Sequence, residues 1–254
     1  MSELENVNRN MVRDTGVLVD PTWKDVYLIA GLCLIGIALL AIGSAVLNII
    51  VGAMPSDSIT FFNSLAGNPT LSYGTYGLLF ISDFLWLPAT LALYLSLKHI
   101  NKNWMLIWAA ICFMYILISM ANMFNGLTLV SLAQHYTAAT TDALRTGYAA
   151  AADYPLATIP LFFISMWIMG GLGYLIVGLV MLKGVFGKIA AYLGIITGIV
   201  SLIVGFSIFI PVLAWLSLLT FITIPIWDIL VGYKLYNLSR ADKQPVKNSM
   251  ETTA

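Results

Sequence analysis

One uninterrupted apolar stretch, residues 78–97, constrains the fold of this chain more than any other part of its sequence. It reads LLFISDFLWLPATLALYLSL, and Asp83 is its one charged residue. An α-helix needs about 20 mostly apolar residues to cross the hydrocarbon core of a bilayer. The stretch therefore predicts a transmembrane helix, and Pro88 within it predicts a bend.

The composition of the whole chain is that of a membrane protein. Of its 254 residues, 60% are hydrophobic and 9% are charged, whereas about 25% of the residues in a soluble domain are charged. The formal net charge is zero, and no basic patch with interleaved aromatic residues occurs. We therefore expect the lipid bilayer as a partner and no nucleic acid.

Further apolar segments predict an all-α, polytopic membrane protein with six transmembrane helices. The expected helices cover residues 26–51, 78–97, 104–130, 156–182, 189–210 and 212–233. Two segments predict short outward-facing surface helices. The first, at 57–66, follows caps at Pro55, Ser56 and Asp57 and carries Ile59, Phe62 and Leu65 on one face; the second, at 140–152, is too polar to span and would be capped by Thr140 or Thr141. The bundle, residues 23–238, would lie between two polar tails, residues 1–22 and 239–254.

The distribution of lysine and arginine predicts the orientation. Eleven of the 12 basic residues fall on one side of the expected bundle: Arg9, Arg13, Lys24, Lys98, Lys102, Lys183, Lys188, Lys234, Arg240, Lys243 and Lys247. Arg145 alone falls on the other side. Since cytoplasmic loops carry an excess of positive charge, we expect a multi-pass protein of the cell membrane with both termini in the cytoplasm.

Asp83 is the first candidate site residue, because a carboxylate at membrane depth is costly and usually faces the bundle interior or water. Counted from residue 78, it would lie about 8 Å below the outer hydrocarbon edge. Polar residues of helices one and three reach a comparable depth, and Trp86 would border the site; the polar set is Ser44, Asn48, Asn122 and Asn125, with Ser119 on the same face as the last two. The sequence leaves two readings open: an outward-facing polar pocket, or hydrogen bonds that only hold three helices together.

Asp228 is a second intramembrane acid, in the sixth expected helix beside Trp227 and three residues after Pro225. Proline in a helix frees a backbone carbonyl, here that of Phe221. The kink and the acid together could coordinate a cation or carry a proton. Alternatively, Asp228 could pair with a cytoplasmic lysine that extends toward it.

The sequence lacks the parts of the common enzyme and cofactor sites. His99 and His135 lie at opposite membrane boundaries, which excludes a bis-histidine haem or a zinc triad within the bundle. GxSxG, CxxC and HExxH are absent, so we expect no cofactor, no metal and no catalytic residue. Cys33 and Cys112 lie in apolar runs and are expected to remain reduced.

Several motifs resemble those of a family of bacterial and archaeal six-helix membrane proteins that is known only as a domain of unknown function. They are LYLSLKHINK at residues 93–102, GYLIVG at 173–178 and the final IWDILVGYKLYNL. The resemblance implies a six-helix fold in a membrane. It implies no activity, and therefore assigns no role to Asp83 or Asp228.

Two functional hypotheses follow. The first is a non-enzymatic membrane protein that binds or moves an unidentified small solute, a proton or a lipid, because two proline-bent helices each carry an acid. The second is a structural or accessory subunit whose polar residues only fix helix packing, and an intramembrane lipid-modifying enzyme remains a further alternative. Glycine-rich faces on the fourth and fifth helices, including Gly194 and Gly198, are compatible with contacts within one chain or with a homo-oligomer.

Overall fold

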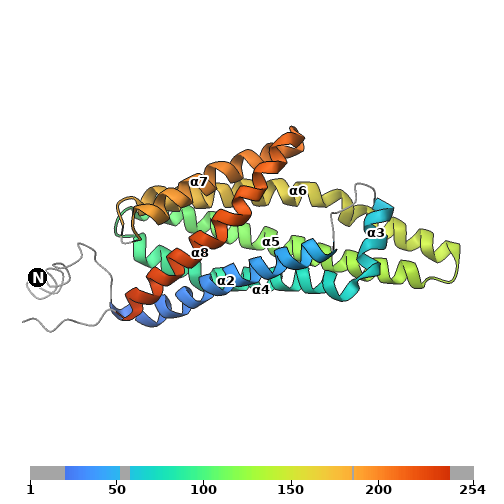
Figure 1. Cartoon of the computed structure of the whole chain (residues 1–254), viewed down its shortest axis with the longest axis horizontal. Helices are drawn as coiled ribbons and strands as arrows, with labels where there is room; N and C mark the ends of the chain where they lie inside the picture. Colours follow the sequence, from blue (N-terminus) through green and yellow to red (C-terminus); the bar gives the residue numbers. More distant parts are fainter. Residues whose placement is uncertain (1–20, 52–57, 185, 241–254) are drawn as a thin grey trace, which may run out of the picture.

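A computed structural model describes residues 21–51, 58–184 and 186–240, and within these ranges the chain is helical and contains no strand (Figure 1). The two predicted tails and the predicted caps at residues 55–57 lie outside the described residues. The elements are η1 (Pro21–Trp23), α2 (Lys24–Val51), α3 (Ser58–Gly67), α4 (Pro69–Leu97), α5 (Lys102–Ala138), α6 (Asp142–Met181), α7 (Lys188–Gly205), η2 (Phe206–Ile208), η3 (Pro211–Leu216) and α8 (Ser217–Arg240).

The predicted all-α polytopic fold is confirmed. Six segments of the described chain are long and apolar enough to span a membrane, and they contain the six predicted helices. The final span includes the 3-10 turn η3 ahead of α8. The fifth helix is shorter than expected, because α7 ends at Gly205 and the chain continues in η2 rather than to residue 210.

The six long helices form a closed ring in chain order. Each of α2, α4, α5, α6, α7 and α8 packs against the next, and α8 returns to α2. One end of the ring, which we call the tail end, contains the start of α2, the α4–α5 turn, the α6–α7 turn and the end of α8. The opposite side, with α3 and the α5–α6 turn, is the hairpin end; α5 and α6 extend there beyond the other helices (Figure 1).

The predicted surface helix at residues 140–152 is wrong. These residues form the first turns of α6, which has 40 residues, and α5 has 37. At ~1.5 Å per residue both helices exceed the ~30 Å hydrocarbon thickness. The alanine-rich sequence continues both helices because alanine favours helix, and Ala133 and Ala152 are buried in the hairpin. Thr141, one of the two predicted caps, does accept a hydrogen bond from the Leu144 amide at 3.3 Å.

The acid-bearing helix begins at Pro69 and not at residue 78, which changes the expected depth of Asp83. Pro69 occupies the first helical position after Asn68, where a missing amide hydrogen costs nothing. The extra residues, 69–77, are less apolar and were therefore not counted as membrane helix. Asp83 is the midpoint of the 29-residue α4, rather than six residues from its outer end.

The first predicted surface helix is present as α3. Its Phe62 and Leu65, two of the predicted apolar positions, are buried together with Phe61. They pack against Leu129, Val130 and Ala133 of α5 and Ala152 of α6, forming a small hydrophobic core at the hairpin end. The apolar face of α3 thus covers the α5–α6 hairpin.

The main hydrophobic core fills the tail half of the ring. It includes Leu34, Leu93, Leu97, Met105, Met181 and Leu235, all fully buried. Glycines allow the closest helix contacts: Gly171 and Gly178 of α6 meet Gly198 and Gly194 of α7. The glycine pattern noted in the sequence is therefore used inside one chain, where small residues let helix backbones approach.

Candidate functional site

Asp83 lies inside the ring, with 4% of its surface exposed. Its main polar neighbour is the Ser119 hydroxyl group of α5. The Oδ2 atom has no hydrogen-bond partner among the described residues. The contact with Ser119 joins α4 to α5, and the unpartnered oxygen retains capacity for a further ligand.

Asp228 is fully buried on α8, and neither of its oxygens has a partner that meets hydrogen-bond geometry. The Tyr174 hydroxyl group of α6 is its polar neighbour, but this contact is looser than a closed hydrogen bond. Because unsatisfied polar atoms are rare in protein interiors, a group of this kind needs an explanation. Asp228 makes no ion pair with a lysine; the one salt bridge within the described residues joins Arg145 to Asp142 on the hairpin.

The two acids belong to one neighbourhood. Tyr115 of α5 lies within electrostatic range of both Asp83 and Asp228. The helix register supports this proximity. Gly36 of α2 packs against Leu85 of α4, and Gly31 of α2 packs against Gly232 of α8. Asp83 on α4 and Asp228 on α8 are therefore both close to the same level of α2, which packs against both of these helices. The sequence placed them near opposite membrane surfaces, because it did not show where α4 begins or which helices adjoin.

Aromatic rings surround the acids. The ring of Tyr174 lies between those of Trp86 and Trp227, with edge-to-face geometry and centroid distances of 6.3 and 5.0 Å. The buried Trp227 Nε1 atom has no hydrogen-bond partner, and it lies above Gly194 of α7. We call Asp83, Trp86, Tyr115, Ser119, Tyr174, Trp227 and Asp228 the central cluster.

The structure separates the other predicted site residues from this cluster. Asn122 donates to the Met166 sulfur at 3.7 Å, and Asn125 donates to the Pro155 carbonyl and the Thr158 hydroxyl at 2.9 and 2.8 Å. Both asparagines thus bind α6 instead of Asp83. They lie on the same helix as Ser119, but they are one and two turns closer to the hairpin end.

The predicted contribution of α2 is also displaced. Ser44 is buried, but Gly43 packs against Leu78, so Ser44 lies about two turns from the level of Asp83. Asn48 lies within α2, and its side chain is outside the described part of the structure. The structure consequently brings together Asp83, Trp86 and Asp228 from the predicted set.

Three members of the central cluster escaped sequence analysis: Tyr115, Tyr174 and Trp227. A usable signal existed on α5, where Cys112, Tyr115 and Ser119 follow helical spacing and share one face. Tyr174 belongs to the GYLIVG motif, but its ring could not be assigned to an acid without knowing the partner helix. Trp227 was noted only as the neighbour of Asp228.

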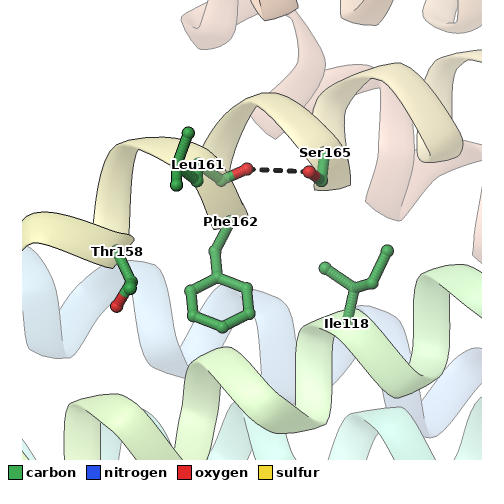
Figure 2. Close-up of a pocket in the computed structure, with 5 residues that line it drawn as sticks. All are labelled: Ile118, Thr158, Leu161, Phe162 and Ser165. Carbon is green, nitrogen blue, oxygen red and sulfur yellow. Dashed lines mark hydrogen bonds between the residues drawn. The ribbon is translucent and has the colours of Figure 1, made fainter. Parts of the chain in front are cut away.

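A separate hollow of about 240 Å³ lies between α5 and α6, nearer the hairpin end. Figure 2 shows its lining residues, Ile118, Thr158, Leu161, Phe162 and Ser165; the Ser165 hydroxyl group donates to the Leu161 carbonyl at 2.8 Å. The lining is mostly apolar and includes neither acid. Thr158, which lines this hollow, also accepts the hydrogen bond that Asn125 donates to α6.

The donors in the central cluster do not form a metal site. Across the described ranges, no group of three or more histidine, cysteine, aspartate or glutamate side chains is close enough to hold a metal ion. Cys112 is near Thr90 of α4, and Cys33 is on α2; both thiols are free. The chemistry available to the cluster is that of two carboxyl groups, tyrosine hydroxyl groups and aromatic faces.

Comparison with known proteins gives a family without an assigned activity. No curated protein and no solved structure matches the chain. A family model described as "Domain of unknown function (DUF4386)" matches residues 29–233, which covers the whole central cluster and all six long helices apart from the start of α2 and the end of α8. The resemblance seen in the sequence motifs is thereby confirmed, and the chain belongs to the DUF4386 family of membrane proteins.

Proposed function

We propose that this integral membrane protein binds or moves a small solute, a proton or a lipid at the central cluster inside its helix ring. The observation that carries the proposal is the convergence of Asp83 and Asp228, buried and incompletely hydrogen-bonded, on one tyrosine. Burying such groups destabilises a protein unless they serve another purpose. Ionisable residues inside membrane bundles commonly mark ion or substrate pathways.

Two prolines support a binding role over a rigid one. Pro88 lies five residues after Asp83 in α4, and Pro225 lies three residues before Asp228 in α8. Each removes a backbone hydrogen bond from a helix that carries an acid. Broken or bent helices with polar groups at depth are a recurring feature of membrane transporters.

A structural or accessory role is the second candidate, and specific contacts favour it. Ser119 is the polar neighbour of Asp83, while Asn125 donates hydrogen bonds to both the Pro155 carbonyl and the Thr158 hydroxyl of α6. These contacts join α4 to α5 and α5 to α6 without any ligand. On this reading Asp83→Asn would preserve the helix contact and change nothing else.

Thermal unfolding of the purified protein distinguishes the two roles. The melting temperature would be measured across a panel of pH values, monovalent and divalent cations, and lipids, for wild type, Asp83→Asn and Asp228→Asn. Asp153→Asn is the matched control, because Asp153 is an exposed acid on the hairpin part of α6. A ligand or pH step that shifts wild type and the control, but not the two cluster variants, supports binding at the cluster. Identical profiles for all four proteins would refute it.

The proposed cellular arrangement follows from the charge distribution and not from the coordinates. We propose a cell-membrane protein with the tail end in the cytoplasm, because the basic residues gather at that end. A homo-oligomer remains part of the proposal. Since Gly171, Gly178, Gly194 and Gly198 pack against one another within the chain, an intersubunit contact would use other faces.

A further inference from the structure

We propose that the ligand exchanged at the central cluster is the proton, and that Asp83 and Asp228 form a donor and acceptor pair connected by tyrosine hydroxyl groups. This inference rests on the proposed function and narrows it to one ligand. It depends on the composition of the cluster, on the space around Asp228 and on a difference between the two ends of the ring.

The surrounding helices supply no positive charge to balance two carboxylates. The titratable groups that face the pair are Tyr115 and Cys112 from α5 and Tyr174 from α6. At this level α7 contributes Gly194, and α2 contributes apolar residues around Leu34 and Ile35. Every lysine and arginine in the described helices lies toward a helix end or on the hairpin. Two ionised acids would therefore lie in an environment of low dielectric without a counter-charge, and a proton bound to either acid removes one of the two charges.

A metal or organic cation fits the same site poorly. Hard cations require several oxygen ligands, and calcium takes six to eight. Asp228 instead faces Tyr174 and adjoins Trp227, and it has no exposed surface that a water-sized group could touch. A proton needs neither a coordination shell nor a cavity. The hollow beside Phe162 is the wrong place for such an ion, because its lining includes neither acid.

The two ends of the ring give this pair different access. Toward the tail end, Leu93, Leu97, Met105, Met181, Val231 and Leu235 are fully buried and block the interior. Toward the hairpin end, Leu79 and Phe80, which lie one turn from Asp83 on α4, are only half-buried, and the axes of α2 and α8 diverge (Figure 1). Asp83 has 4% of its surface exposed and Asp228 has none, which assigns proton entry from the hairpin end to Asp83 and makes Asp228 the sealed partner.

The transfer step changes only O–H bonds. A protonated Asp83 gives its proton to the Tyr115 hydroxyl oxygen as Tyr115 gives its own proton to the Tyr174 hydroxyl oxygen, and Tyr174 gives its proton to the Asp228 carboxylate. The products are an Asp83 carboxylate, two unchanged tyrosines and a protonated Asp228. No oxidant, reductant or co-reactant is required. Tyr115 is the relay candidate, since it interacts electrostatically with both acids, and Tyr174 is the final hydroxyl neighbour of Asp228.

Infrared difference spectroscopy of the full chain in lipid nanodiscs tests this inference. Spectra at acidic and neutral pH would be compared for wild type, Asp83→Asn, Asp228→Asn and the exposed control Asp153→Asn. We expect wild type and the control to show carboxylic-acid carbonyl bands from two buried groups, and each cluster variant to lose one of them. Unchanged bands in both cluster variants would overturn the inference. Asparagine is nearly the same size as aspartate, and circular dichroism would confirm that each variant is folded.

A Tyr115→Phe variant provides a second measurement that does not remove an acid. After a rapid pH jump, the carboxyl bands of this variant should change at least about tenfold more slowly than those of wild type, a factor equivalent to ~1.4 kcal/mol of barrier. An unchanged rate would refute the tyrosine relay. If sodium or potassium at constant pH shifts the bands and pH does not, the proton inference fails while binding at the cluster stands. Both proposals fail if no cation, pH value or lipid of the panel shifts either the carboxyl bands or the melting temperature.

Discussion

Gly31 of α2 and Gly232 of α8 face each other where the ring of helices closes. A Cβ atom on Gly31 would lie 2.7 Å from the Gly232 carbonyl oxygen, and a Cβ atom on Gly232 would lie 2.8 Å from the Gly31 carbonyl oxygen. The first and last membrane helices therefore meet backbone to backbone. This crossing is in the tail half of the bundle, one turn beyond Asp228 along α8.

Substituting Gly31 with alanine should destabilise the protein. The added methyl group would also lie 2.8 Å from the Tyr236 amide nitrogen, and backbone atoms cannot move aside as a side chain can. Overpacking of this kind costs about 1–3 kcal/mol, which should appear as a lower melting temperature in detergent. Gly77→Ala on α4 is the control: a Cβ atom there meets nothing within 4 Å, so alanine should leave stability equal or higher. Equal melting temperatures for both variants would contradict the close crossing.

Removing the Phe62 side chain should release α3 from the hairpin. The Phe62 ring is 4% exposed and makes an edge-to-face contact with Tyr136, with centroids 5.3 Å apart. Phenylalanine-to-alanine changes in cores cost about 3–5 kcal/mol. Hydrogen exchange of the amides in Ser58–Gly67 should accelerate strongly in Phe62→Ala and remain unchanged in Asn63→Ala, since Asn63 is exposed. Equal exchange in the two variants would show that α3 does not depend on this contact.

Single cysteines should report the orientation of the bundle. In a background without Cys33 and Cys112, a cysteine replacing Thr140 at the α5–α6 turn should react with a membrane-impermeant thiol reagent on intact cells. One replacing Asn103 at the start of α5 should react only after the cells are opened. Both positions are exposed, and Thr140 avoids disturbing the cap that Thr141 forms. Labelling of Asn103→Cys in intact cells would reverse the proposed orientation.

The two native cysteines should remain reduced and should not pair. Cys33 lies on α2 and Cys112 on α5, and in the ring α4 packs between these helices. A disulfide needs Cα atoms within about 7 Å. Cys33→Ala and Cys112→Ala should each lower the free energy of unfolding by about 1 kcal/mol or less, since each removes one small apolar group. Wild type should migrate identically on reducing and non-reducing gels. A reducible mobility shift that either substitution abolishes would contradict this arrangement.

The sequence by itself determined the membrane helices, because spanning depends on local composition. An apolar run of sufficient length has the same preference for lipid in any tertiary context. The amphipathic α3 and the cap at Thr141 were likewise predictable, since a helical face and an N-cap depend on neighbours within a few residues. The second surface helix was misread because its polar residues follow a membrane span without a helix break, and hydropathy cannot distinguish a surface helix from the extension of a long one.

The tertiary structure alone decided how the candidate residues combine. Lipid-facing and core-facing sides of membrane helices are similarly apolar, so the sequence did not indicate which faces meet. Asn122 and Asn125 therefore shared a predicted site with Asp83, whereas helix packing directs them to α6. The same packing brings Asp83 and Asp228, which are 145 positions apart in the sequence, within electrostatic range of one tyrosine. Local preferences specify each helix, but the pairing of small residues such as Gly31 with Gly232 sets the register that assembles the site.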